Sequence, residues 1–116
     1  MTSVPFEIKI SDFGFAKLQL SSSPEDKLER AQTICGTPAY MAPDQILERN
    51  KHYTEKFDVW SLGNICYELL VGHPPFIGKM SSDDFELRLK EGNYEFPSEL
   101  NLSPEIMHLI SRCLQY

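Results

Sequence analysis

Apolar residues in the middle of the chain recur at helical spacing. Between residues 58 and 71 they follow one another at steps of three and four, in a set made of Val59, Leu62, Ile65, Cys66, Leu69 and Leu70. Trp60 and Tyr67 add apolar surface on other sides, so we expect this helix to be buried centrally. Gly72 is expected to end it, and two prolines shortly afterwards prevent its continuation.

Three further helices are predicted. Residues 82–91 have an amphipathic pattern that ends at a glycine. The residues that this helix offers for packing are Phe85, Leu87 and Leu89. A helix over about 103–115 is expected because a Ser-Pro-Glu sequence supplies an N-cap, a proline at the first position and an acid in the first turn. Pro43 is a good first residue for a short helix that runs to Glu48.

The N-terminal residues alternate between apolar and polar, which is the period of a half-buried strand. The apolar side chains of this predicted strand are Phe6, Ile8 and Ile10. The Asp12-Phe13-Gly14 turn ends it, and residues 15–18 are expected to form a second short strand. Residues 19–32 are polar and charged and favour a surface loop. The predicted fold class is therefore mainly α, with a short β-strand pair at the N-terminus.

Composition limits the environment and the partners of the chain. Its 116 residues suffice for one domain, and the hydrophobic content of 41% is ordinary for a globular protein. The formal net charge is −6 and no basic run occurs, which disfavours nucleic acid and anionic membranes as partners. No signal peptide or membrane span is apparent, and the three cysteines form no CxxC pair. We expect an intracellular location, in cytoplasm or nucleus.

Four short motifs follow one another along the chain. They are Asp12-Phe13-Gly14, Gly36-Thr37-Pro38-Ala39-Tyr40-Met41-Ala42-Pro43, Asp58-Val59-Trp60-Ser61-Leu62-Gly63 and Gly72-His73-Pro74-Pro75-Phe76. Asp-Phe-Gly alone is too short to be diagnostic, but the order and spacing of all four resemble the C-terminal lobe of eukaryotic protein kinases. The second motif resembles Ser/Thr kinases rather than Tyr kinases. The residues leave the subfamily open between Unc-51-like, Aurora-like and calcium/calmodulin-type kinases.

This resemblance covers essentially the whole chain and implies a partial C-lobe of the protein-kinase-like α+β fold. The activation segment would span residues 12–44, helix F about 58–71, helix G about 82–91 and helix H about 103–115. The implied activity is transfer of the γ-phosphoryl group of ATP, with Mg²⁺, to Ser or Thr of a protein substrate.

Several site residues are implied by the resemblance. Asp12 matches the metal-binding Asp, although an Asp at this position could also simply cap a turn. Thr33 matches the activation-loop phosphothreonine, and Lys17 matches a basic residue that contacts its phosphate. The substrate-binding wall would consist of Gly36, Thr37 and Pro38. Glu68 matches a position that meets a substrate Arg in basophilic kinases, although a solvated helix Glu is an alternative.

Other matched residues have structural roles in the family. Phe13 would pack in the hydrophobic column that joins the two lobes, and Gly14 allows the sharp turn. Asp58 would anchor the backbone of the catalytic loop, within a motif whose other structural members are Trp60 and Gly63. Asp44 replaces the Glu of the family's Ala-Pro-Glu motif. The Arg that usually pairs with that acid is absent here, and Arg112 comes too early to match it.

The catalytic counterparts of these residues are missing from the 116 residues. No Gly-rich loop, strand Lys or His-Arg-Asp catalytic loop occurs, so no catalytic base and no phosphate-binding Lys is present. We therefore expect the isolated chain to be inactive and to bind neither ATP nor Mg²⁺ tightly. Three hypotheses stay open, namely a piece of a Ser/Thr kinase, a non-catalytic kinase-like binding module, and a non-functional truncated gene product. Expected partners are a protein substrate and an upstream kinase, with self-association through exposed core residues.

Overall fold

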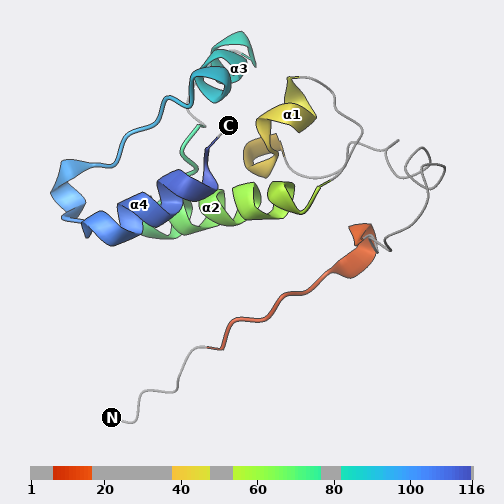
Figure 1. Cartoon of the computed structure of the whole chain (residues 1–116). Coiled ribbons are helices and arrows are strands. Elements are labelled where there is room, and N and C mark those ends of the chain that lie inside the picture. Colours follow the sequence, from red (N-terminus) through yellow and green to blue (C-terminus); the bar gives the residue numbers. More distant parts are fainter. Residues whose placement is uncertain (1–6, 17–37, 48–53, 77–81, 116) are drawn as a thin grey trace.

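The computed structural model of the chain describes residues 7–16, 38–47, 54–76 and 82–115 (Figure 1). The four α-helices in these ranges are α1 (Pro43–Ile46), α2 (Glu55–Val71), α3 (Ser82–Glu91) and α4 (Pro104–Cys113). The short 3-10 helices in the same ranges are Phe13–Phe15, Pro38–Tyr40 and Ser98–Leu100. None of the described helices combines the length and the apolar character needed to cross a membrane.

Helix α2 is the longest of the described helices, and the others are arranged around it. It begins three residues before the range expected from the apolar period. Glu55 and Asp58 lie in its first turn, where the helix dipole stabilises negative charge. It ends at Gly72, which has a left-handed backbone with φ of 93°. The backbone N–H of Gly72 donates to the carbonyl of Glu68 at 2.8 Å and closes the last turn.

An aromatic cluster covers one side of α2. The ring of Trp60 stacks on Phe76, with centroids 5.6 Å apart and planes inclined by 10°. About two helical turns further on, Tyr67 meets Tyr94 edge-on at 5.8 Å, and Tyr94 in turn meets Phe76 at 5.4 Å. The Tyr67 hydroxyl donates to the carbonyl of Glu95 at 2.7 Å, so its polar end is satisfied within the cluster. These contacts fix the segment after α3 against the C-terminal half of α2.

Helix α4 lies along a second side of α2 (Figure 1). The hydroxyl of Ser103 caps its start by accepting from the backbone N–H of Ile106 at 3.3 Å. Ile110 and Leu114, one turn apart, are buried against α2. The two helices approach most closely at Gly63, where a Cβ atom would lie only 2.7 Å from the Cβ atom of Cys113. The absence of a side chain at Gly63 therefore sets how closely α4 packs.

The remaining side of α2 is exposed, which differs from the central burial expected from its sequence. The exposed apolar side chains of the helix are Val59, Leu62, Ile65, Leu69 and Leu70. The buried positions are instead Phe57, Trp60, Gly63, Asn64 and Tyr67. Apolar periodicity marks residues that favour burial, but it does not supply a partner for them. Self-association through this exposed side stays a prediction.

Helix α3 packs through fewer residues than expected. Leu89 is buried and Phe85, four residues earlier, is half-buried, whereas Leu87 is 53% exposed. The expectation that all three pack was wrong for Leu87. Residues four apart share a helix face, but a residue two positions along points roughly 160° away from it. Helix α3 lies against α1.

The predicted N-terminal strand pair is not shown. Residues 7–12 have no regular secondary structure, and Phe13–Phe15 forms a 3-10 helix rather than the start of a second strand. Ile8 and Ile10 are 90% and 85% exposed, and the segment leads away from the helices in Figure 1. Alternating apolar and polar residues favour a half-buried strand, but a strand also needs a neighbouring strand to accept and donate its backbone hydrogen bonds. No segment among the described residues pairs with residues 7–12. Phe6, Lys17 and Leu18 lie outside the described residues.

We predict that Gly63→Ala lowers the free energy of unfolding by about 1–3 kcal/mol, the range typical of overpacking. The added Cβ would lie 2.7 Å from Cys113 and 3.0 Å from Leu114, so α4 has to shift. The helix-propensity gain of about 0.5–1 kcal/mol offsets only part of this cost. Urea unfolding followed by circular dichroism measures the change. Gly14→Ala is the matched control, because its Cβ would meet nothing closer than 3.5 Å. Equal midpoints for the two variants would contradict the prediction.

Candidate functional site

Two hydrogen bonds hold the Pro38–Tyr40 turn against α2. The hydroxyl of Ser61 donates to the backbone carbonyl of Tyr40 at 2.8 Å. The Tyr40 hydroxyl donates to Oε2 of Glu68 at 2.6 Å. Ser61 and Glu68 are seven residues apart, about two helical turns, so they present their oxygens on one face of α2. The turn is thus held at both its backbone and its side chain.

The Tyr40–Glu68 contact also has an electrostatic consequence. The hydrogen bond to the Glu68 carboxylate raises the pKa of the Tyr40 phenol above its ordinary value, and desolvation and the nearby negative charge act in the same direction. In the part of the chain that the structure describes, no Lys or Arg forms an ion pair with Glu68. The half-buried Glu68 carboxylate therefore has a neutral donor on one side and retains its capacity to accept from a cation.

The residues after the turn are anchored in the core. Met41, Ala42 and Pro43 are buried, and Pro43 begins α1, as the sequence predicts. The side chain of Gln45 accepts from the backbone N–H of Ala42 at 3.0 Å and so satisfies a donor at the helix start. Trp60, which belongs to the same buried cluster as Ala42, lies on the facing side of α2.

Asp44 lies at a cavity of about 380 Å³ between α1, the start of α2 and the end of α4. Arg112 lines the same cavity, although its sequence position had excluded it as the partner of Asp44. No ion pair between the two is formed among the described residues. The structure thus brings this acid and this base to one cavity without joining them.

The Asp12-Phe13-Gly14 turn has a different geometry from the one expected. Asp12 itself has the left-handed backbone, with φ of 62°, whereas the expectation placed the special backbone angles at Gly14. Phe13 is 67% exposed and joins no hydrophobic cluster among the described residues, and its packing in a column between two lobes stays a prediction. The backbone N–H of Ala16 closes the turn on the carbonyl of Phe13 at 3.0 Å.

The described residues do not by themselves fit a Mg²⁺–ATP site. No group of three or more His, Cys, Asp or Glu side chains within the described ranges could hold a metal ion. Mg²⁺ prefers near-octahedral oxygen ligands, and the exposed carboxylate of Asp12 supplies at most part of such a set. The other ligands would have to come from outside these residues.

The remaining predicted site residues are distributed as follows. Asp58 is exposed in the first turn of α2, whereas Trp60 and Gly63 are buried. Pro38 is exposed at the start of the turn that Ser61 and Glu68 hold. The residues that lie outside the described ranges are Lys17, Thr33, Gly36 and Thr37.

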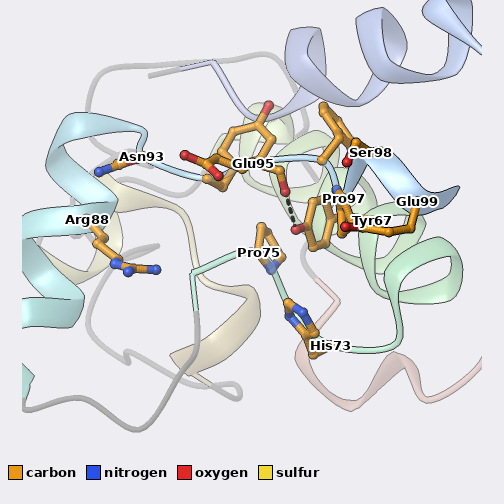
Figure 2. Close-up of a pocket in the computed structure, with 11 residues that line it drawn as sticks. Tyr67, His73, Pro75, Arg88, Asn93, Glu95, Pro97, Ser98 and Glu99 are labelled. Carbon is orange, nitrogen blue, oxygen red and sulfur yellow. Dashed lines mark hydrogen bonds between the residues drawn. The ribbon is translucent and has the colours of Figure 1, made fainter. Parts of the chain in front are cut away.

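A second cavity, of about 720 Å³, lies between α3, the end of α2 and residues 93–99. Figure 2 shows Arg88 and Glu99 on opposite sides of it, with Tyr67 and Pro75 between them. Its lining mixes one guanidinium, two carboxylates, a histidine and aromatic rings. These lining residues do not indicate one particular class of ligand. No sequence pattern indicated this cavity, because residues from three separate segments enclose it.

Comparison with known proteins identifies the family to which this chain belongs. The chain matches the protein kinase domain over residues 1–116, and it belongs to that family. It is 41% identical over 109 residues to the probable cell cycle serine/threonine-protein kinase CDC5 homolog of Encephalitozoon cuniculi. It is 39% identical over 110 residues to Aurora kinase C of Mus musculus, and 35% identical over 116 residues to the serine/threonine-protein kinase ATG1 of Gibberella zeae.

These matches take in nearly all of the chain but only part of each relative. They cover 94%, 95% and 99% of this chain, in the order given above. The chain spans 22%, 36% and 11% of the respective relatives. The chain is therefore similar to one region of longer Ser/Thr kinases.

An unperturbed tyrosine has a pKa near 10, and we predict that the pKa of Tyr40 lies above this value. Glu68→Gln should lower the pKa of Tyr40 toward the ordinary value. The neutral phenol is the favoured form in the folded state. The protonated Tyr40 phenol therefore stabilises the folded state below pH 10, and this stabilisation is lost as the pH rises through the raised pKa of Tyr40. NMR titration of the Tyr40 ring measures both effects. Glu95→Gln is the control, because Glu95 does not contact Tyr40, and an equal shift in both variants would contradict the prediction.

Proposed function

We propose that these residues supply the activation segment and the helical platform of a Ser/Thr protein kinase. That kinase would transfer the γ-phosphoryl group of ATP to Ser or Thr of a protein substrate, within the cytoplasm or the nucleus. The family match over the whole chain supports this proposal, as do the three relatives, each of which is named a Ser/Thr kinase or an Aurora kinase.

The observation that carries the proposal is the attachment of the Pro38–Tyr40 turn to α2. Phosphoryl transfer depends on positioning and on electrostatic stabilisation, so the surface that holds the substrate must be rigid. The bonds from Ser61 and Tyr40 fix this turn from two directions. Pro38 is exposed beside them, in agreement with a substrate-facing wall formed by Gly36, Thr37 and Pro38.

Glu68 is the residue that we propose selects the substrate. Its carboxylate is half-buried on the same face of α2, and its Tyr40 contact holds it in one orientation. A carboxylate held in this way can accept a guanidinium through two parallel hydrogen bonds. Since no described cation pairs with it, we propose that it takes an Arg of the substrate.

The nucleotide and its metal belong to the proposed kinase rather than to this chain alone. Protein kinases use ATP and Mg²⁺, and Asp12 would contribute one carboxylate ligand within a complete site. We also propose that Thr33 carries the activating phosphate and that Lys17 contacts it. A phosphate adds close to two negative charges and can order a loop through basic partners.

We predict that the isolated chain shows no ATP-dependent phosphorylation of a basic peptide, because it contains no Gly-rich loop, strand Lys or catalytic base. A longer coding sequence that adds these motifs is expected to be active and to carry phosphate on Thr33, detected by mass spectrometry. In that longer protein Asp12→Ala should lower kcat more than about a hundredfold.

Two outcomes would contradict this prediction. The first is turnover by the isolated chain that Asp12→Ala abolishes. The second is an upstream sequence that lacks kinase motifs, which would favour the non-catalytic binding module. Glu86→Gln, on the exposed surface of α3, is the matched control for loss of one carboxylate without a site role.

We predict that Glu68→Gln in the active longer protein raises KM for an Arg-containing peptide by about tenfold or more, the scale of one charge-assisted contact. A matched peptide with Ala in place of Arg should be phosphorylated with the same KM by both proteins. Peptide kinetics at constant ionic strength measure the ratio, and Glu95→Gln is the control. If Glu68→Gln changed both peptides equally, Glu68 would serve the fold rather than selectivity.

A further inference from the structure

Two cysteines come together where α2 and α4 pack most closely. Cys113 is the last residue of α4, and its Cβ atom would lie 2.7 Å from a Cβ atom at Gly63. Cys66 follows Gly63 by three residues on α2, so it lies on the same side of the helix, one turn further on. The backbone geometry of this contact therefore places the two cysteines next to each other across the helix pair.

The surroundings of these cysteines support the same conclusion. Both are free thiols and both are half-buried, so a small oxidant can reach them. Burial raises the pKa of Cys113, and the charge of a Cys66 thiolate acts in the same direction, in agreement with the placement of the two cysteines from the backbone. The third cysteine, Cys35, lies outside the described residues.

We propose that Cys66 and Cys113 form a reversible disulfide that joins α2 to α4 under oxidation by a peroxide. One thiolate attacks a peroxide oxygen, the O–O bond breaks, and a sulfenic acid and hydroxide form. The second thiolate then attacks the sulfenic sulfur, and the S–S bond forms as the S–O bond breaks and hydroxide leaves. Two thiols lose two electrons and two protons in total, and hydrogen peroxide is reduced to two molecules of water.

The bond requires the Cβ atoms of Cys66 and Cys113 to come within about 3.5–4.5 Å of each other. A Cβ atom at Gly63 would lie 2.7 Å from that of Cys113, and Cβ atoms three residues apart on a helix are roughly 5–6 Å apart, so Cys66 lies within one helical turn of the contact. Cys113 can make this adjustment because it ends α4, where one bond from the backbone N–H of Leu114 to the carbonyl of Ile110 closes the last turn. The packing of Ile110 one turn earlier need not change. The inference is independent of the proposed kinase activity.

Peptide mapping tests the proposal directly. The folded chain is treated with hydrogen peroxide, remaining thiols are alkylated, and the digest is analysed by mass spectrometry without reductant. We expect a linked peptide pair that contains Cys66 and Cys113 and that dithiothreitol removes. The linkage closes a long loop, so Tm should rise by roughly 10 °C over the reduced protein. Cys35→Ser should keep both effects, whereas Cys113→Ser should lose both.

A second variant and a control in urea complete the test. Cys66→Ala replaces Cys113→Ser if the latter fails to fold, and it should also lose the link. Oxidation in concentrated urea should remove the preference for this pair over pairs that involve Cys35, because the preference comes from the fold. Three results would overturn the proposal, namely a link through Cys35 as the main product, sulfinic acid at either cysteine without a link, or no link in the folded protein.

Discussion

The close approach of α4 to α2 at Gly63 is the constraint on which the other contacts depend. With a Cβ position only 2.7 Å from the Cβ atom of Cys113, any side chain at residue 63 would force α4 to shift. Ile110 and Leu114 can then be buried on α2, in the same cluster as the stacked rings of Trp60 and Phe76. Trp60 precedes Gly63 by three residues, so the two lie roughly 60° apart on one buried face of the helix. A helix held along this face is rigid enough to carry a site on the face beside it.

The face beside it holds the Pro38–Tyr40 turn. Ser61 and Glu68 are two turns apart, and each bonds a different part of Tyr40. Hydrogen bonds at the rim of a protein contribute little unless the groups that make them are already ordered. The order here comes from the packing of α2, so the candidate site depends on the core beneath it.

Local sequence rules predicted the helices well and their environment less well. The Ser-Pro-Glu sequence placed the start of α4 within one residue of Pro104, because a cap and a proline act locally. Leu87 and the exposed leucines of α2 were misplaced because apolar character does not say which face finds a partner. The predicted strand pair is not shown for the same reason. Ile8 and Ile10 have the apolar–polar alternation of a strand, but they have no pairing strand among the described residues.

The family resemblance implied roles for Glu68 and Pro38, which stay predictions, but it did not imply the bonds from Tyr40 and Ser61. Those bonds join segments 21 and 28 residues apart, and no local rule places one on the other. The seven-residue spacing of Ser61 and Glu68 was visible in the sequence and could have shown that both face the same way. It could not show that Tyr40 lies there, because that depends on the buried residues Met41 to Pro43.

The exposed side of α2 indicates where the rest of the proposed kinase would pack. Asp58, Leu62, Ile65 and Leu69 follow one another at steps of four, three and four, so they form one stripe along the helix. Ile65 and Glu68 are three residues apart, roughly 60° around the helix, so this stripe borders the face that holds Tyr40. A catalytic base has to stand within hydrogen-bond reach of the substrate hydroxyl. On the proposed function, the part of the kinase that carries the base must therefore pack beside the substrate-holding face. The apolar residues of the stripe, Leu62, Ile65 and Leu69, are exposed in the part of the chain that the structure describes, and they border this face.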